Sequence, residues 1–236
     1  MTELPEAGPT ARDLVDVRLL EAIRTGGCPA CAVRARAERG IVETIISERV
    51  LDRGFRADLE RKEGFCRRHV VELVSTDRRE TGGILGSSLL LGAILDRRTA
   101  GLSKVVGSGG RTVRSKVKVA QARPPCLACS QGATAVETAL TRLAERASDD
   151  AWASLAAAVP FCLDDFLALW VIAGGASSFE PIARSHLARF EALHERLDGF
   201  AHHSSHDRRH LLTDEERSAA DEAARALGGD RYGGSS

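Results

Sequence analysis

Residues 28–50 read CPACAVRARAERGIVETIISERV, and this stretch decides the fold class. Its apolar side chains recur every three or four positions, which places them on one face of a helix. They are Val33, Ala37, Ile41, Val42, Ile45, Ile46 and Val50. Pro29 suits the first turn of a helix. We therefore expect a helix over residues 29–51 that begins at two cysteines.

Similar patterns continue along the chain and predict a fold made of helices. The expected helices cover residues 65–75, 84–105, 127–146, 150–172 with a break at Pro160, 179–201, and a last one that starts at Thr213. Thr213 and Glu216 have the spacing of a capping box. Only 4% of the residues are aromatic, whereas sheets favour aromatic and β-branched side chains. The expected fold class is all-α.

The cysteines form a repeat. The CxxC at Cys28 and Cys31 recurs as Cys126 and Cys129, and the pair Cys66 and His69 recurs as Cys162 and Asp165. An internal repeat of this kind predicts two related structural units. We expect a first three-helix unit at residues 10–106, a basic linker at 107–125, a second unit at 126–203 and a helical appendage at 204–228.

Each CxxC supplies only half of the ligands of a tetrahedral metal site. If the two units are arranged in tandem, the other two ligands of each site come from the same unit as its CxxC. The expected sites are therefore Cys28, Cys31, Cys66 and His69 in the first unit and Cys126, Cys129, Cys162 and Asp165 in the second. Thiolate and imidazole ligands suit zinc, and they could also hold an iron–sulfur cluster. A dithiol redox pair and simple packing of buried cysteines are the other interpretations.

The Asp165 site is expected to be the weaker of the two, because a carboxylate is a harder ligand than imidazole. Asp164, His186 or His194 could replace Asp165, or that site could have lost its metal. A separate histidine cluster is a weaker candidate for a metal or anion site. It consists of His202, His203, His206 and His210.

The motifs CPxC, GFCxxH and a second CxxC followed by FC resemble those of a bacterial family of unknown function. The resemblance covers roughly residues 20–225. Members of that family typically have histidine where this chain has Asp165. The resemblance implies the paired sites and brings no reaction with it.

Charge and composition narrow the choice of partners. Lys plus Arg and Asp plus Glu number 33 each, so nucleic acid is not an expected partner. The first residues lack the pattern of a secretory signal, which predicts a cytoplasmic location. The apolar stretch at 82–95 is too short to span a bilayer and is expected to be a buried helix whose glycines allow close approach.

No catalytic motif stands out, because the chain lacks a Gly-rich phosphate loop, GxSxG and HExxH. The favoured hypothesis is a non-enzymatic metal-binding protein, with zinc as the expected metal, that binds a partner or senses metal or redox state. The partner would be a protein or a small molecule. An iron–sulfur or dithiol redox protein is the alternative, and an enzyme with a pocket under the 82–95 helix is a third.

Overall fold

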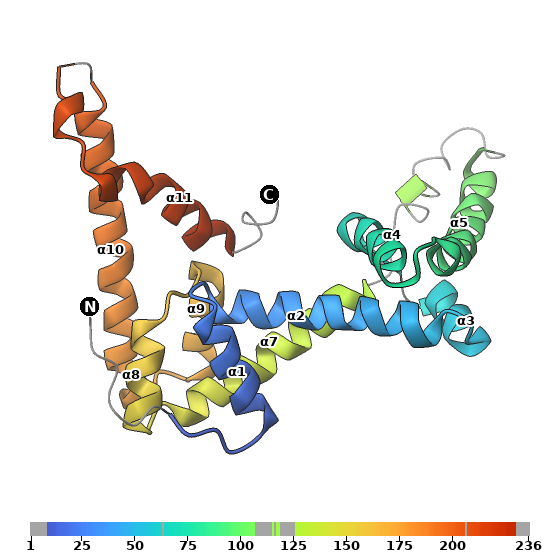
Figure 1. Ribbon diagram of the computed structural model, residues 1–236, viewed down its shortest axis with the longest axis horizontal. Helices are drawn as coiled ribbons and strands as arrows, with labels where there is room; N and C mark the ends of the chain where they lie inside the picture. Colours follow the sequence, from blue (N-terminus) through green and yellow to red (C-terminus); the bar gives the residue numbers. More distant parts are fainter. Residues whose placement is uncertain are drawn as a thin grey trace. The chain divides into compact units, whose positions relative to one another are not determined.

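The computed structural model describes residues 9–62, 64–106, 115, 117, 118, 126–205 and 207–229. Over this part of the chain it contains ten α-helices and no strand, which confirms the all-α class (Figure 1). The helices are α1 (Leu14–Arg24), α2 (Pro29–Thr44), α3 (Arg53–Lys62), α4 (Arg67–Thr81), α5 (Leu85–Val106), α7 (Leu127–Arg146), α8 (Asp150–Ala158), α9 (Leu163–Ile172), α10 (Glu180–His203) and α11 (Asp214–Gly228). A π-helical turn, Ile45–Arg49, follows α2, and 3₁₀ turns cover Ser177–Phe179 and Arg209–Leu211. None of the described helices is both long and apolar enough to cross a bilayer.

Contacts within the chain define two units. The first joins residues 1–34 to 135–236, and the second comprises residues 35–134. This division differs from the tandem boundaries expected from the repeat, since it falls inside α2 and inside α7. Most of the expected basic linker, 107–125, lies outside the described residues.

The first unit contains the larger core, which surrounds Trp152 and Phe179, both fully buried. Asp16 on α1 is also fully buried and pairs with Arg142 and Arg146 of α7. In the same unit α10 and α11 lie side by side (Figure 1). The capping box predicted at Thr213 starts α11, because Thr213 and Glu216 each accept the other's backbone N–H.

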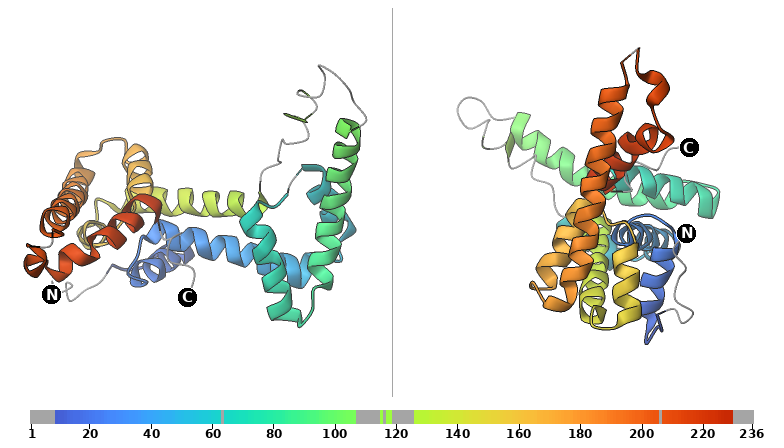
Figure 2. Two further views of the ribbon diagram at one scale, coloured as in Figure 1. Left: turned by 90° about the horizontal axis from the view of Figure 1, so that it is seen from above. Right: turned by 90° about the vertical axis from the view of Figure 1, so that its left-hand side faces the viewer.

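The second unit has a smaller core formed by α3, α4, α5 and the turn after α2, with α4 beside α5 (Figure 2). Asp77 at the end of α4 accepts hydrogen bonds from the backbone N–H and hydroxyl of Ser87, at 2.7 and 2.9 Å, and so holds the start of α5. A Cβ on Gly86 would lie 3.1 Å from the Val50 side chain, so this glycine does allow the close approach predicted for the segment. The helix is only partly buried, however, since Leu85 is 72% exposed.

Candidate metal centres

The structure brings the eight predicted ligand residues together in two groups, each inside one unit. We call them cluster 1 (Cys28, Cys31, Cys162 and Asp165) and cluster 2 (Cys66, His69, Cys126 and Cys129). In each cluster the four ligand atoms lie within 4.8 Å of one another. The predicted grouping by tandem unit was therefore wrong, because each CxxC meets the second pair of the other repeat.

Local geometry explains why the correct pairing could not be read from the spacing. Cys66 and Cys162 are the N-cap residues of α4 and α9, and each CxxC lies at the start of α2 or α7. All four ligand pairs thus have the same local structure, and either pairing would satisfy it. Long-range backbone contact selects one, because the N–H of Leu127 donates to the carbonyl of Gly64 at 3.1 Å. This bond holds the start of α7 beside Cys66.

All four ligand residues of cluster 1 are buried. The Sγ atom of Cys162 lies 3.8 Å from that of Cys28 and 3.9 Å from that of Cys31. The Oδ2 atom of Asp165 lies 3.6, 3.4 and 3.0 Å from the sulfurs of Cys28, Cys31 and Cys162. Its other oxygen accepts a hydrogen bond from Arg34 at 3.0 Å. The carboxylate therefore points one oxygen at the sulfurs and is oriented through the other.

Cluster 2 has a histidine in the equivalent place. The Nδ1 atom of His69 lies 3.2 Å from the sulfurs of Cys66 and Cys126 and 3.4 Å from that of Cys129. The sulfurs of Cys66 and Cys129 are 3.8 Å apart. Nδ1 is thus the nitrogen that would bind a metal.

The other nitrogen of His69 is surrounded by charged groups. Its Nε2 lies 3.1 Å from Arg68, 3.5 Å from Glu38 and 3.6 Å from Glu72, and Glu38 is buried and paired with Arg68. A carboxylate behind a ligand histidine fixes the ring orientation and makes the ligand more basic. Neither Glu38 nor Arg34 was predicted. Arg34 lies three residues after Cys31, a spacing that could have revealed it, whereas Glu38 lies in a charged stretch that gave no signal.

These distances fit one tetrahedral ion in each cluster. With zinc–sulfur bonds of about 2.3 Å, two sulfurs of a tetrahedron are roughly 3.8 Å apart. The three sulfur–sulfur distances given above are 3.8, 3.8 and 3.9 Å. The shorter nitrogen–sulfur and oxygen–sulfur distances agree with shorter bonds from zinc to those atoms. Both ligand sets therefore have the chemistry and the spacing to hold a metal ion.

The thiols within each cluster shift one another's pKa values. Hydrogen bonding to Cys162 lowers the pKa of Cys28, but hydrogen bonding to Cys31 and burial outweigh it and raise this pKa to about 12. Burial and the neighbouring Cys126 raise the pKa of Cys129 to about 12, whereas hydrogen bonds to the His69 backbone and to Cys129 overcome burial and lower the pKa of Cys66. A metal ion would displace the remaining thiol protons on binding. Burial and Arg68 lower the pKa of His69, which keeps the imidazole neutral, as a metal ligand must be.

The alternative ligands considered for Asp165 lie elsewhere. His186 is fully buried against Phe161 and Phe166, and its Nε2 contacts the carbonyl of Ala156 at 3.0 Å. Asp164 is exposed, and the His194 side chain is 75% exposed. None of the three belongs to either cluster.

The histidine cluster at the end of α10 has other contacts in the structure. His203 pairs with Glu216 at 3.0 Å, and His202 lies 2.8 Å from a nitrogen of Arg208. His206 lies outside the described residues. Among the described residues this segment forms no group of potential ligands, so the weak prediction of a metal site here gains no support.

The end of α11 covers cluster 1. Gly229 is buried and has φ +65° and ψ −179°, a backbone conformation available almost only to glycine. A Cβ at this position would lie 2.8 Å from the sulfur of Cys31 and 3.8 Å from that of Cys162. The chain can therefore close over the thiols only without a side chain at residue 229.

Gly229→Ala is expected to destabilise the first unit by about 1–3 kcal/mol, the typical cost of such backbone strain. The added methyl group should also push the end of α11 off cluster 1 and speed the release of its metal to a chelator. Gly174→Ala is the matched control, since Gly174 also has a positive φ of +60° but a Cβ there would meet nothing within 4 Å. Equal release rates in both variants would show that α11 does not shield the cluster.

Comparison with known proteins gives one match. A family model described as "Family of unknown function (DUF6062)" matches residues 11–173, which include both clusters, whereas α10 and α11 follow the matched region. No curated protein and no solved structure matches the chain.

Proposed function

We propose that this chain, which belongs to the DUF6062 family of unknown function, is a non-enzymatic zinc protein whose two ions tie its helices together. The observation that carries the proposal is the spacing of the ligand atoms, which fits one tetrahedral ion in each cluster. Structural zinc contributes directly to folding. The remaining surface would bind a partner, or the thiols would sense metal or redox state.

Four protein ligands in each cluster favour a structural role over a catalytic one. A catalytic zinc keeps a coordination position open for water or substrate, and structural sites are closed. Burial of all four ligands in cluster 1 points the same way. In cluster 2 the histidine is fully buried and the three cysteines are partly buried.

The alternative is an iron–sulfur or dithiol redox protein. An iron–sulfur cluster contains at least two irons, and cysteines bound to different irons are farther apart than ligands of one ion, whereas all four ligand atoms of each cluster here lie within 4.8 Å of one another. Sulfur spacing thus favours a single ion, and the absorption spectrum of protein purified without oxygen separates zinc from iron.

Metal analysis of the purified chain is expected to give two zinc ions and no visible colour, and a chelator should remove cluster 1 metal first. Cluster 1 uses a hard oxygen ligand where cluster 2 has an imidazole, so it should bind zinc less tightly. Asp165→His is expected to slow that first release. An arginine beside a ligand imidazole is already tolerated in cluster 2, where Arg68 lies 3.1 Å from His69, so Arg34 should not prevent the gain.

Asp164→His is the control, because residue 164 is exposed and outside the cluster. A content of one zinc in the parent and in Asp165→His would mean that cluster 1 holds no metal. Simultaneous loss of both ions would contradict the predicted difference in affinity.

A further inference from the structure

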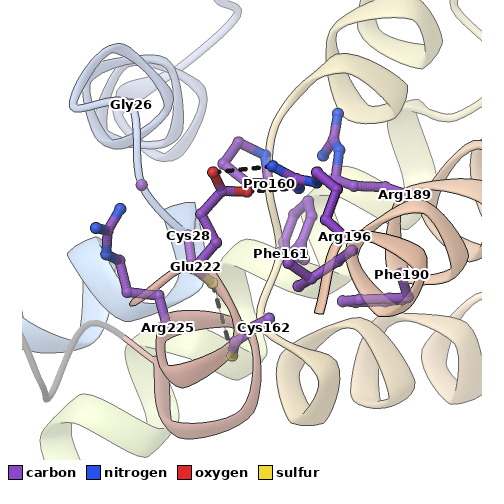
Figure 3. A pocket seen from close by; sticks show the side chains of 13 residues that line it. Gly26, Cys28, Pro160, Phe161, Cys162, Arg189, Phe190, Arg196, Glu222 and Arg225 are labelled. Carbon is purple, nitrogen blue, oxygen red and sulfur yellow. Dashed lines mark hydrogen bonds and ion pairs between the residues drawn. The ribbon is translucent and has the colours of Figure 1, made fainter. Parts of the chain in front are cut away.

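A cavity of about 140 Å³ opens beside cluster 1, inside the first unit. The sulfurs of Cys28 and Cys162 lie at one side of it, and one face of α10 and one face of α11 form its walls (Figure 3). Neither the metal ligands nor the core packing accounts for the charged groups in these walls.

The walls carry an excess of positive charge. Three arginines and a single carboxylate, Glu222, line the cavity. Both oxygens of Glu222 accept hydrogen bonds from Arg196, at 3.1 and 2.6 Å, so this pair neutralises itself. Arg189 donates to two backbone carbonyls, at 2.7 and 2.8 Å, and no carboxylate of the described residues pairs with it. The side chain of Arg225 makes no hydrogen bond or close ion pair among the described residues, and its charge acts on Glu222 only from a longer distance.

Cluster 1 does not fully compensate this charge. Three thiolates and Asp165 around a divalent ion leave two negative charges, of which Arg34 already balances one. In Figure 3 the guanidinium groups of Arg189 and Arg225 point away from the two sulfurs. A positive excess therefore remains on the side of the cavity away from the cluster.

The rest of the lining is apolar and includes Phe161, Phe190 and Leu193. A cavity with a largely apolar wall and a few polar or charged groups is the usual form of a small-molecule site. Nucleotides and peptide side chains with phosphate need the larger pockets of about 300 Å³ and above that ligands of that size occupy.

We propose that this cavity binds a small organic carboxylate, with its charged end toward Arg225 and its short apolar tail against Phe161 and Phe190. An inorganic anion would satisfy Arg225 and leave the aromatic wall without a partner. The site is independent of the proposed zinc chemistry, because no ligand of cluster 1 has to leave for it to be filled.

Titration calorimetry on the full chain as purified tests the proposal, with butyrate as the probe and butyramide as its neutral counterpart. Butyrate is expected to bind at one site for each chain, and butyramide at least about tenfold more weakly, because a carboxylate gains charge-assisted hydrogen bonds that an amide does not. Arg225→Gln should weaken butyrate binding about tenfold. Residue 225 is exposed, so the variant should fold normally.

Arg217→Gln is the matched control, since Arg217 is an exposed arginine of the same helix outside the cavity. It should bind butyrate like the parent. Equal binding of butyrate and butyramide, tighter binding of inorganic phosphate than of butyrate, equal effects of the two arginine variants, or no saturable binding would each overturn the proposal. Because metal content is measured separately on the same samples, failure here is distinguishable from failure of the zinc sites.

Discussion

Cys66→Ser is expected to unfold the second unit while the first unit stays folded. Among the described residues the core cluster of the second unit contains 9 buried residues, against 19 in the first, so the second unit depends more on its metal. A structural zinc site in a small domain has an apparent binding free energy of about 10–16 kcal/mol at neutral pH. Loss of even about 5 kcal/mol lowers the melting temperature of a unit of about 100 residues by roughly 20–40 °C.

Hydrogen exchange measured by mass spectrometry would locate the effect. Fast exchange should spread over residues 35–134 in the variant, and the helices α8 to α10 should keep their protection. Ser75→Ala on α4 is the control, because Ser75 is exposed and only bonds to the carbonyl of Glu72. An unchanged melting temperature together with full zinc content would rule out a structural role for cluster 2.

Two double variants are expected to differ by a whole metal ion, because the ligand pairs are exchanged between the repeats. Cys28→Ser with Cys162→Ser removes two ligands from cluster 1 alone, so about one zinc should remain in cluster 2. Cys28→Ser with Cys66→Ser damages both clusters, and almost no zinc should remain. Zinc content after dialysis against a weak chelator gives the answer directly.

The tandem grouping predicts the opposite pair of results for the same proteins. Under it, the Cys28 and Cys66 substitutions would share a site and spare one zinc, and the Cys28 and Cys162 substitutions would lose both. The single variants provide the controls, since each should retain one ion under either grouping. The experiment therefore separates the two arrangements without a structure of any variant.

Most helices could be predicted because their apolar side chains repeat with the helical period. The start of α2 beside Cys28, the break at Pro160 and the cap at Thr213 are all set by local chemistry. Two helices, α1 and α3, were not predicted from the sequence. In α1 the fully buried position of Asp16 interrupts the apolar face, because its charge is matched by arginines from α7. In α3 the sequence RGFRADLERK is so highly charged that its two large apolar side chains, Phe55 and Leu59, are too few to reveal a period.

The ligand residues could be identified from sequence, whereas their pairing could not. Residue type and spacing carry the coordination chemistry, and both belong to short segments. Which segments meet depends on contacts such as the bond from Leu127 to Gly64, between residues distant in the sequence. The cover by Gly229 was missed for the same reason, since a glycine near the end of a helix usually signals only the helix end.

Because of the exchanged pairing, all ligands of cluster 2 lie between the two ligand pairs of cluster 1 in the sequence. The inner site joins residues 57 positions apart, His69 and Cys126, and the outer site joins Cys31 to Cys162 across 131 positions. Closing the longer loop costs only roughly 0.7 kcal/mol more entropy. The order of synthesis matters more than this entropy difference. Cys28 and Cys31 are synthesised first, and their partners in cluster 1, Cys162 and Asp165, are synthesised last. Until then the nearest available ligands are Cys66 and His69, so a metal ion that arrives early meets an incorrect but chemically complete site.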